Sequence, residues 1–222
     1  MEIIRYAELK AQPWRNGGGV TRELASHSAS TSSAESPGPD GGWDWRVSIA
    51  DVSKAGDFSA FPGMDRVLTV VEGELLLLIV DGAEHPLEKY RPFRFSGDAA
   101  ASGALPTGDI RDLNVITRTG VFKGYTSIIE LSKKRAHPVF GGQFGILLQG
   151  QATVSPGTAG GEPSGAEPAD VGPSDSTAGA AGTPAGPTTL ARYDAVVGSD
   201  AGAPEILGRG FLAVVSIDRV AD

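Results

Sequence analysis

The stretch VLTVVEGELLLLIV, residues 67–80, is the strongest indication of fold class in this 222-residue chain. Two runs of β-branched and leucine residues meet at Glu72-Gly73, where glycine can adopt the positive φ that a two-residue hairpin turn requires. Asp81-Gly82 repeats this turn signal at the end of the second run. The stretch therefore predicts short consecutive strands joined by tight turns.

The same pattern continues along most of the chain. Residues 46–50 alternate polar and apolar side chains, as a strand with one buried face does. Further strand-like runs occur at residues 110–117, 125–131, 145–148 and 211–217. Because helical periodicity is scarce, the sequence predicts an all-β protein.

An internal repeat indicates how the strands are grouped. The segment VEGEL at residues 71–75 is echoed by LQGQA at 148–152, and LEKY at 87–90 is echoed by LARY at 190–193. The glycine and the tyrosine of each copy are 17 residues apart in the first and 43 in the second. The repeat predicts two fused jelly-roll-like β-barrels, an N-terminal lobe over residues 1–118 and a C-terminal lobe over 119–222.

Two segments differ in composition from the rest. Residues 26–42 are rich in Ser, Ala, Gly and Pro, and we expect a flexible loop there. Residues 151–189 contain almost no large apolar side chain and are interpreted as a disordered insertion in the second lobe. Function is expected outside both segments.

Composition excludes several classes of function. A net charge of −8, with no basic cluster larger than residues 133–135, argues against nucleic-acid binding. The absence of cysteine excludes disulfides and thiolate metal sites. The longest apolar run, residues 75–80, is too short to cross a bilayer, so we expect no membrane association. With no secretory leader at the N-terminus, a cytoplasmic location is expected.

The first candidate site is PWRNGGGVTRE, residues 13–23. Three consecutive glycines let the backbone approach another group closely, while Asn16 and Thr21 can hydrogen-bond and Arg22 supplies positive charge. The alternative is a tight turn between strands, with Trp14 in the core. A P-loop is excluded because no Lys-Ser/Thr pair follows the glycines.

Arginine and a polar strand form the remaining candidates. Arg66, and secondarily Arg46, could bind a carboxylate in a barrel interior, although either could instead pair with an aspartate of the chain. Asp112 and Asn114 alternate with apolar neighbours, so both should lie on one strand face. They could orient a ligand, and Asp112 or Asp98 could act as a general base. They could equally satisfy backbone groups at a junction between lobes.

Four stretches together resemble the HutD/Ves family of bacterial proteins. They are residues 13–24, 45–73, 93–98 and 108–118, in the family's order, whereas the match after residue 120 is weak. The resemblance implies a bicupin linked to histidine utilisation, which senses or limits a pathway intermediate, with formylglutamate suggested as the ligand. The polar residues shared with the family are Asn16, Thr21, Arg22, Arg46, Ser48, Arg66, Asp98, Asp112 and Asn114.

A metal site is not expected. In metal-binding cupins, residues equivalent to 56–66 carry two histidines and a glutamate, but here Arg66 occupies the glutamate position. A cation there repels a divalent metal, and His27, His85 and His137 lack the spacing of metal ligands. The sequence therefore predicts no metal and no cofactor.

Three functions remain open from the sequence. The first is a metal-free binding protein for a small carboxylate, using Asn16, Thr21, Arg22, Arg46, Ser48, Arg66, Asp112 and Asn114. The second is an isomerase or hydrolase of a small metabolite, with Asp98 or Asp112 as base. The third is a structural role through assembly, and a homo-oligomer is compatible with all three. No catalytic residue is assigned, and the balance favours binding over catalysis.

Overall fold

The computed structural model describes residues 1–28, 42–157 and 186–221, so most of the two low-complexity segments lies outside the described residues. The structure differs from the prediction where those segments begin and end. Ser26 and His27 belong to a strand, and a strand continues through Ser155 into the predicted insertion. Within the described residues the structure is all-β apart from one short 3-10 turn, η1 (Tyr6–Glu8), as predicted.

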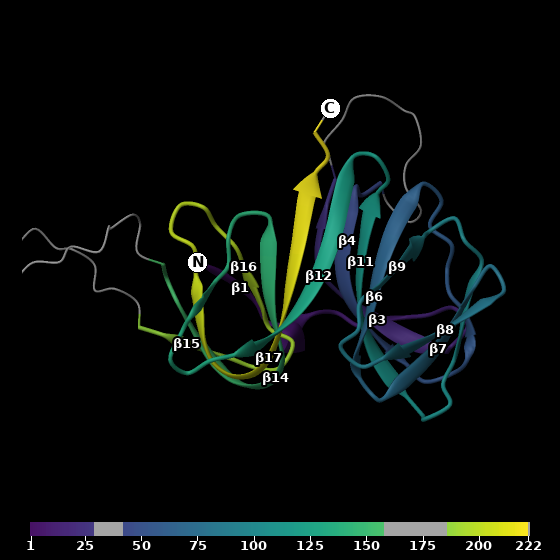
Figure 1. The fold of residues 1–222 in the computed structure, drawn as a ribbon, viewed down its shortest axis with the longest axis horizontal. Helices are drawn as coiled ribbons and strands as arrows, with labels where there is room; N and C mark the ends of the chain where they lie inside the picture. The colour runs from purple at the N-terminus through teal and green to yellow at the C-terminus, as the bar shows by residue number, and fades with distance from the viewer. Residues whose placement is uncertain (29–41, 158–185, 222) are drawn as a thin grey trace, which may run out of the picture.

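The half of the molecule on the right of Figure 1 contains two antiparallel sheets. A six-stranded sheet has the order β2 (Gln12–Pro13), β3 (Gly19–His27), β4 (Trp45–Val52), β11 (Ile110–Arg118), β6 (Met64–Glu72) and β9 (Phe93–Ser96). A four-stranded sheet has the order β5 (Gly56–Asp57), β10 (Ala101–Ala104), β7 (Leu75–Val80) and β8 (Ala83–Glu88). Apolar side chains of both sheets, among them Leu68 and Leu76, form one buried cluster. We call this half the first lobe.

The other half, the second lobe, is built on a seven-stranded sheet. Its order is β1 (Glu2–Ile4), β16 (Ala195–Val197), β14 (Gln143–Ser155), β17 (Glu205–Arg219) and β12 (Phe122–Leu131), with β13 (His137–Pro138) beside β17 and β15 (Thr188–Leu190) beside β14. The sheet has its own buried cluster, which includes Leu147 and Leu212. β1 comes from the segment that the sequence assigned to the first lobe, yet it pairs with β16.

The lobes share a third and larger apolar cluster. The outer face of the six-stranded sheet contributes residues such as Val47 and Leu113, and the second lobe contributes residues such as Ile146 and Val215. All four side chains are completely buried. The two lobes therefore form one continuous packed body.

Of the two hairpin turns predicted within residues 67–82, the structure contains only the second. Asp81 and Gly82 form the predicted hairpin, with φ of 49° and 83°, and Val80 pairs with Ala83. The hairpin predicted at Glu72-Gly73 is wrong, because β6 and β7 belong to different sheets. Gly73 still needs its φ of 85°, since it lets the chain cross between sheets while a Cβ there would lie 2.8 Å from a backbone oxygen.

Residues at equivalent positions of the sequence repeat share local geometry and contacts. Tyr90 and Tyr193, equivalent in the repeat, both adopt positive φ, at 66° and 69°. The Tyr193 hydroxyl donates to Glu72 of the first lobe at 2.7 Å, and the Tyr90 hydroxyl contacts the Gln149 side chain of the second lobe at 3.3 Å. Glu72 and Gln149 are themselves repeat equivalents. The lobes thus exchange matching contacts, as two copies related by a pseudo-twofold axis would.

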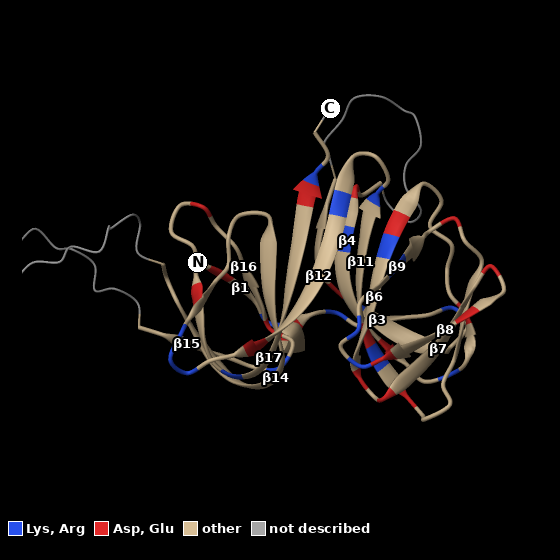
Figure 2. Ribbon diagram, in the orientation of Figure 1, with Lys and Arg blue, Asp and Glu red and all other residues tan. Residues whose placement is uncertain are grey.

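Charged residues of both signs are interspersed over both lobes (Figure 2). None of the helices in the described part of the chain has the length and apolar character needed to span a bilayer.

Candidate functional site

The inner face of the six-stranded sheet brings together six of the predicted residues. Arg46 on β4 and Arg66 on β6 both lie opposite Ile116 of β11, while Ser48 lies opposite Asn114. Directly opposed residues of neighbouring strands project to the same face of a sheet. The residues gathered on this face are Thr21, Arg46, Ser48, Arg66, Asp112 and Asn114.

Arg66 is a charged side chain inside the first lobe, with 3% of its surface exposed. Its Nη2 donates to Asn114 Oδ1 at 2.9 Å, and its Nη1 reaches the Ser59 carbonyl at 3.3 Å. Its Nε is buried and has no hydrogen-bond partner among the described residues. Burial lowers the pKa of Arg66 to about 10, an effect that Asp112 opposes and Arg46 reinforces. Arg66 remains a cation at neutral pH, with donors to spare.

Three phenylalanine rings surround the guanidinium of Arg66. Its Cζ lies 5.6 Å from the ring centre of Phe58, 5.2 Å from that of Phe61 and 4.9 Å from that of Phe95. Cation–π attraction of this kind stabilises a guanidinium away from water. In the sequence, the segment around Phe58 and Phe61 was compared only with the metal-binding segment of cupins. Its phenylalanines were the feature that could have indicated an aromatic environment for Arg66.

Asp112 continues the polar chain behind Asn114. It is completely buried, and its Oδ1 accepts a hydrogen bond from Asn114 Nδ2. Its Oδ2 is buried without a hydrogen-bond partner among the described residues. Burial raises the pKa of Asp112 to about 7, although Arg66 and the Asn114 hydrogen bond act in the opposite direction. Asp112 therefore offsets only part of the positive charge of Arg66 at neutral pH.

Arg46 adds a second cation to this interior face. Its Cζ lies 4.8 Å from the ring centre of Trp43 and 5.4 Å from that of Phe61, the ring that also contacts Arg66. Ser48, one row away, is buried with 2% of its surface exposed. The face is thus built from buried donors and cations next to aromatic walls.

Asn16 borders the hollow at the mouth of the lobe, Thr21 lies on the inner face of β3, and both fit the turn interpretation. The Trp14 Nε1 donates to Thr21 Oγ1 at 2.8 Å, and the Gly18 amide donates to Asn16 Oδ1 at 2.9 Å. A Cβ on Gly19 would lie 2.3 Å from a backbone oxygen, so the glycine allows close strand packing. The side chains of Asn16 and Thr21 therefore already accept hydrogen bonds from nearby residues of the same segment.

Arg22 and Asp98 are not brought to this interior face. Arg22 projects to the opposite face of the sheet and pairs with Asp51 at 3.0 Å. Asp51 also pairs with Arg111 at the junction between lobes. Asp98 is exposed, and its carboxylate accepts from the Gly63 amide at 3.0 Å in a turn. Of the two candidate bases, only Asp112 lies with the arginines.

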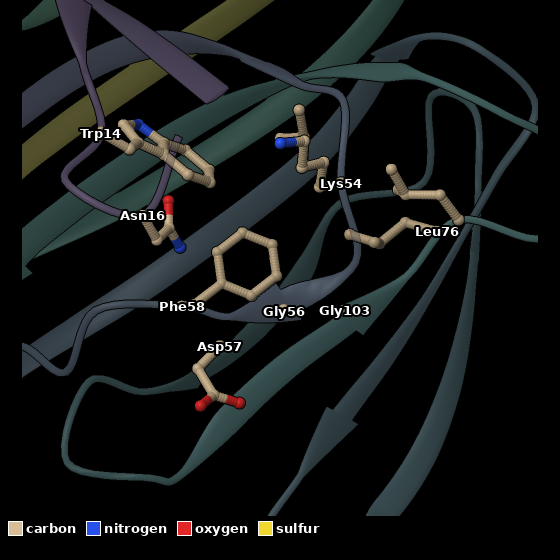
Figure 3. Close-up of a pocket in the computed structure, with 10 residues that line it drawn as sticks. Trp14, Asn16, Lys54, Gly56, Asp57, Phe58, Leu76 and Gly103 are labelled. Atoms are coloured by element: carbon tan, nitrogen blue, oxygen red, sulfur yellow. The ribbon is translucent and has the colours of Figure 1, made fainter. Parts of the chain in front are cut away.

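Two hollows border the described residues. The first, at the mouth of the first lobe, has a volume of about 10 Å³ and is bordered by Trp14, Asn16 and Phe58 (Figure 3). It has room for about one water molecule. The second has a volume of about 380 Å³ and is bordered by Trp45, Phe144 and other residues of both lobes. Within the described part of the chain, Asn16 is the only predicted site residue that lines either hollow.

Metal ligation has no support in the described residues. No group of three His, Cys, Asp or Glu side chains is close enough together to hold an ion there. The His27 ring stacks on Trp45, and the His85 ring packs against Phe93.

The paired antiparallel sheets give the chain a cupin-like fold. In fold it is similar to the YlbA protein of Escherichia coli, with a TM-score of 0.64 and 9% identity over 99% of this chain and 91% of the other. The chain belongs to the HutD family, whose model matches residues 6–209.

Relatives agree with this membership. A 21.2 kDa protein in the hutC 3′ region of Pseudomonas putida is 39% identical over 117 residues, 52% of this chain and 57% of that protein. Protein Ves of Citrobacter koseri is 33% identical over 150 residues, 67% of this chain and 72% of Ves. HutD from Pseudomonas fluorescens, in a structure described as a formate condition, has 25% identity and a TM-score of 0.67 over 99% of both chains.

Proposed function

We propose that this protein binds a small carboxylate at Arg66 inside the first lobe, without a metal. The observation that carries the proposal is the incomplete hydrogen bonding of a buried cation. Nε of Arg66 has no partner among the described residues, and Nη1 has only the 3.3 Å contact to a carbonyl. Buried donors are normally satisfied, and a carboxylate can accept two parallel N–H bonds from a guanidinium.

The charge of the interior supports the same ligand class. Arg46 and Arg66 share the ring of Phe61, whereas Asp112 is only partly ionised at neutral pH because its pKa is about 7. A carboxylate would pair with the buried guanidinium of Arg66, whose charge Asp112 compensates only in part. The family name links its members to histidine utilisation, so formylglutamate is the first ligand to test. In that role the protein would sense or modulate the pathway rather than catalyse a step.

Isothermal titration with formate, formylglutamate and glutamate tests the proposal. Arg66→Met should abolish binding, whereas Arg91→Gln, at an exposed arginine, should leave it unchanged. Arg66→Met also removes the cation that faces Asp112, so Arg66→Met/Asp112→Asn serves as a second, electrically neutral variant. The proposal would be refuted if wild type gave neither binding heat in the titration nor a rise in melting temperature with any of the three carboxylates. Equal affinity of wild type and the folded Arg66 variants would also refute it.

Asp112 favours one alternative, an isomerase or hydrolase acting on the same bound carboxylate. Its pKa of about 7 and its unpartnered Oδ2 are properties of a general base. Carboxylates that bind in the titration should then be incubated with the protein and followed by NMR. Conversion that is lost in Asp112→Asn while binding persists would establish the enzyme; unchanged substrate would leave the binding role.

A further inference from the structure

The side chain of Phe58 lies between the hollow at the mouth of the first lobe and Arg66. One ring borders the hollow at the mouth and also lies 5.6 Å from the guanidinium. Figure 3 shows this ring projecting into the hollow, below Trp14 and Asn16. The hollow has room for about one water molecule, so an organic carboxylate cannot enter through it in this conformation.

Phe58 packs at the edge of the apolar cluster of the first lobe. Its amide donates to the Ala101 carbonyl at 2.9 Å, and its ring meets Trp14 edge to face at 6.2 Å. On another side the ring packs against Gly103, where a Cβ would lie 2.8 Å from it. The ring therefore fits a space that a glycine leaves open.

Residues 58–61 lie outside the sheets and contact Arg66, and we call this segment the cover. Residues 58–61 belong to no strand, and Ser59 and Ala60 are exposed. The cover is tied down at its far end, where the Phe61 amide donates to the Gly97 carbonyl at 2.8 Å. In the middle, the Ser59 carbonyl makes the 3.3 Å contact with Nη1 of Arg66. A long contact of this kind is readily exchanged for a charged acceptor.

We propose that Phe58 is the residue that controls access to Arg66 and limits the size of the carboxylate bound there. The inference rests on the proposed function and adds a route and a size limit to it. Movement of the Phe58 ring joins the hollow to the guanidinium, and the carboxylate replaces the Ser59 carbonyl at Nη1 and takes the unpartnered Nε. The space that the ring vacates limits the size of the carboxylate that binds.

Phe58→Ala tests both parts of the inference. If the open state is populated at about 10% or less, the apparent association rate falls to that fraction of the rate for the open state. The variant should therefore bind formate at least about tenfold faster in stopped-flow tryptophan fluorescence. It should also bind benzoate at least about tenfold more tightly than wild type, because the benzoate ring can occupy the space that Phe58 leaves.

Phe93→Ala is the matched control. Phe93 packs against the same apolar cluster as Phe58, but it does not line the hollow. Phe58→Leu, which keeps most of the side-chain volume, provides a second variant if the alanine variant does not fold. Equal formate and benzoate binding in wild type and in the folded Phe58 and Phe93 variants would overturn the role of Phe58 and leave the proposed function standing. Absence of carboxylate binding in all of these proteins would instead overturn the proposed function itself.

Discussion

Replacing Asp112 by asparagine should change how stability depends on pH. The folded carboxyl has a pKa of about 7, raised by burial from the ordinary 3.8, so it keeps its proton where the unfolded chain has released it. The folded state then binds more protons, and the free energy of unfolding falls as pH rises, by up to about 1.4 kcal/mol per pH unit. Integrated between pH 5 and pH 7, this contribution amounts to about 2 kcal/mol.

The introduced asparagine would be neutral throughout and would keep an oxygen to accept the hydrogen bond from Asn114. Between pH 5 and pH 7 the free energy of unfolding of Asp112→Asn should therefore rise by about 2 kcal/mol relative to that of wild type. Urea unfolding at constant ionic strength, followed by the fluorescence of the three tryptophans, measures this difference. Asp57→Asn, at an exposed carboxylate, is the control. If the curves of wild type and Asp112→Asn run parallel, burial does not hold the proton on Asp112 in the folded state.

Three other measurements follow from the structure. Carboxylate affinity should be roughly tenfold higher at pH 6 than at pH 8 in calorimetry, because Asp112 gains a repelling negative charge as pH rises through about 7; equal affinities would contradict this. Tyr193→Phe should lower the free energy of unfolding by about 1 kcal/mol through loss of its bond to Glu72, with a smaller loss in a Glu72→Gln background. Gly97→Ala should cost about 2 kcal/mol or more in thermal unfolding, since its Cβ would lie 2.4 Å from a backbone oxygen, whereas Gly56→Ala, with open space around it, should change stability by less than about 0.5 kcal/mol.

Strand positions could be predicted from the sequence because they depend on local patterns. Alternation in residues 46–50 and the turn at Asp81-Gly82 specify strands and a hairpin without any knowledge of distant residues. The path of the chain at Gly73 could not be predicted in the same way. A positive φ serves a hairpin and a crossing between sheets equally well, and only pairing partners far along the chain distinguish them. β1 was misplaced for the same reason, since its partner β16 is distant in sequence.

The candidate site was predictable to the extent that it follows strand periodicity. The two-residue spacing of Asp112 and Asn114 placed both on one face, and the structure puts Arg66 on that face from the neighbouring strand. Arg22 also lies on a strand, but no local pattern indicates that its face is turned toward the second lobe. The rings around Arg66 come from separate segments of the chain, so their assembly depends on long-range pairing that periodicity does not reveal.

The pairing of β1 with β16 has a consequence for synthesis on the ribosome. A nascent chain carries β1 through the exit tunnel long before β16 is translated, so the first strand remains without its partner until most of the molecule has emerged. During the same interval the outer face of the six-stranded sheet, including Val47 and Leu113, lacks the cover that the second lobe later supplies. Domains that fold while translation continues usually close one after another. Here the contacts between the two lobes can form only after both have been synthesised. A chain that stops early therefore exposes an apolar surface to which chaperones can bind.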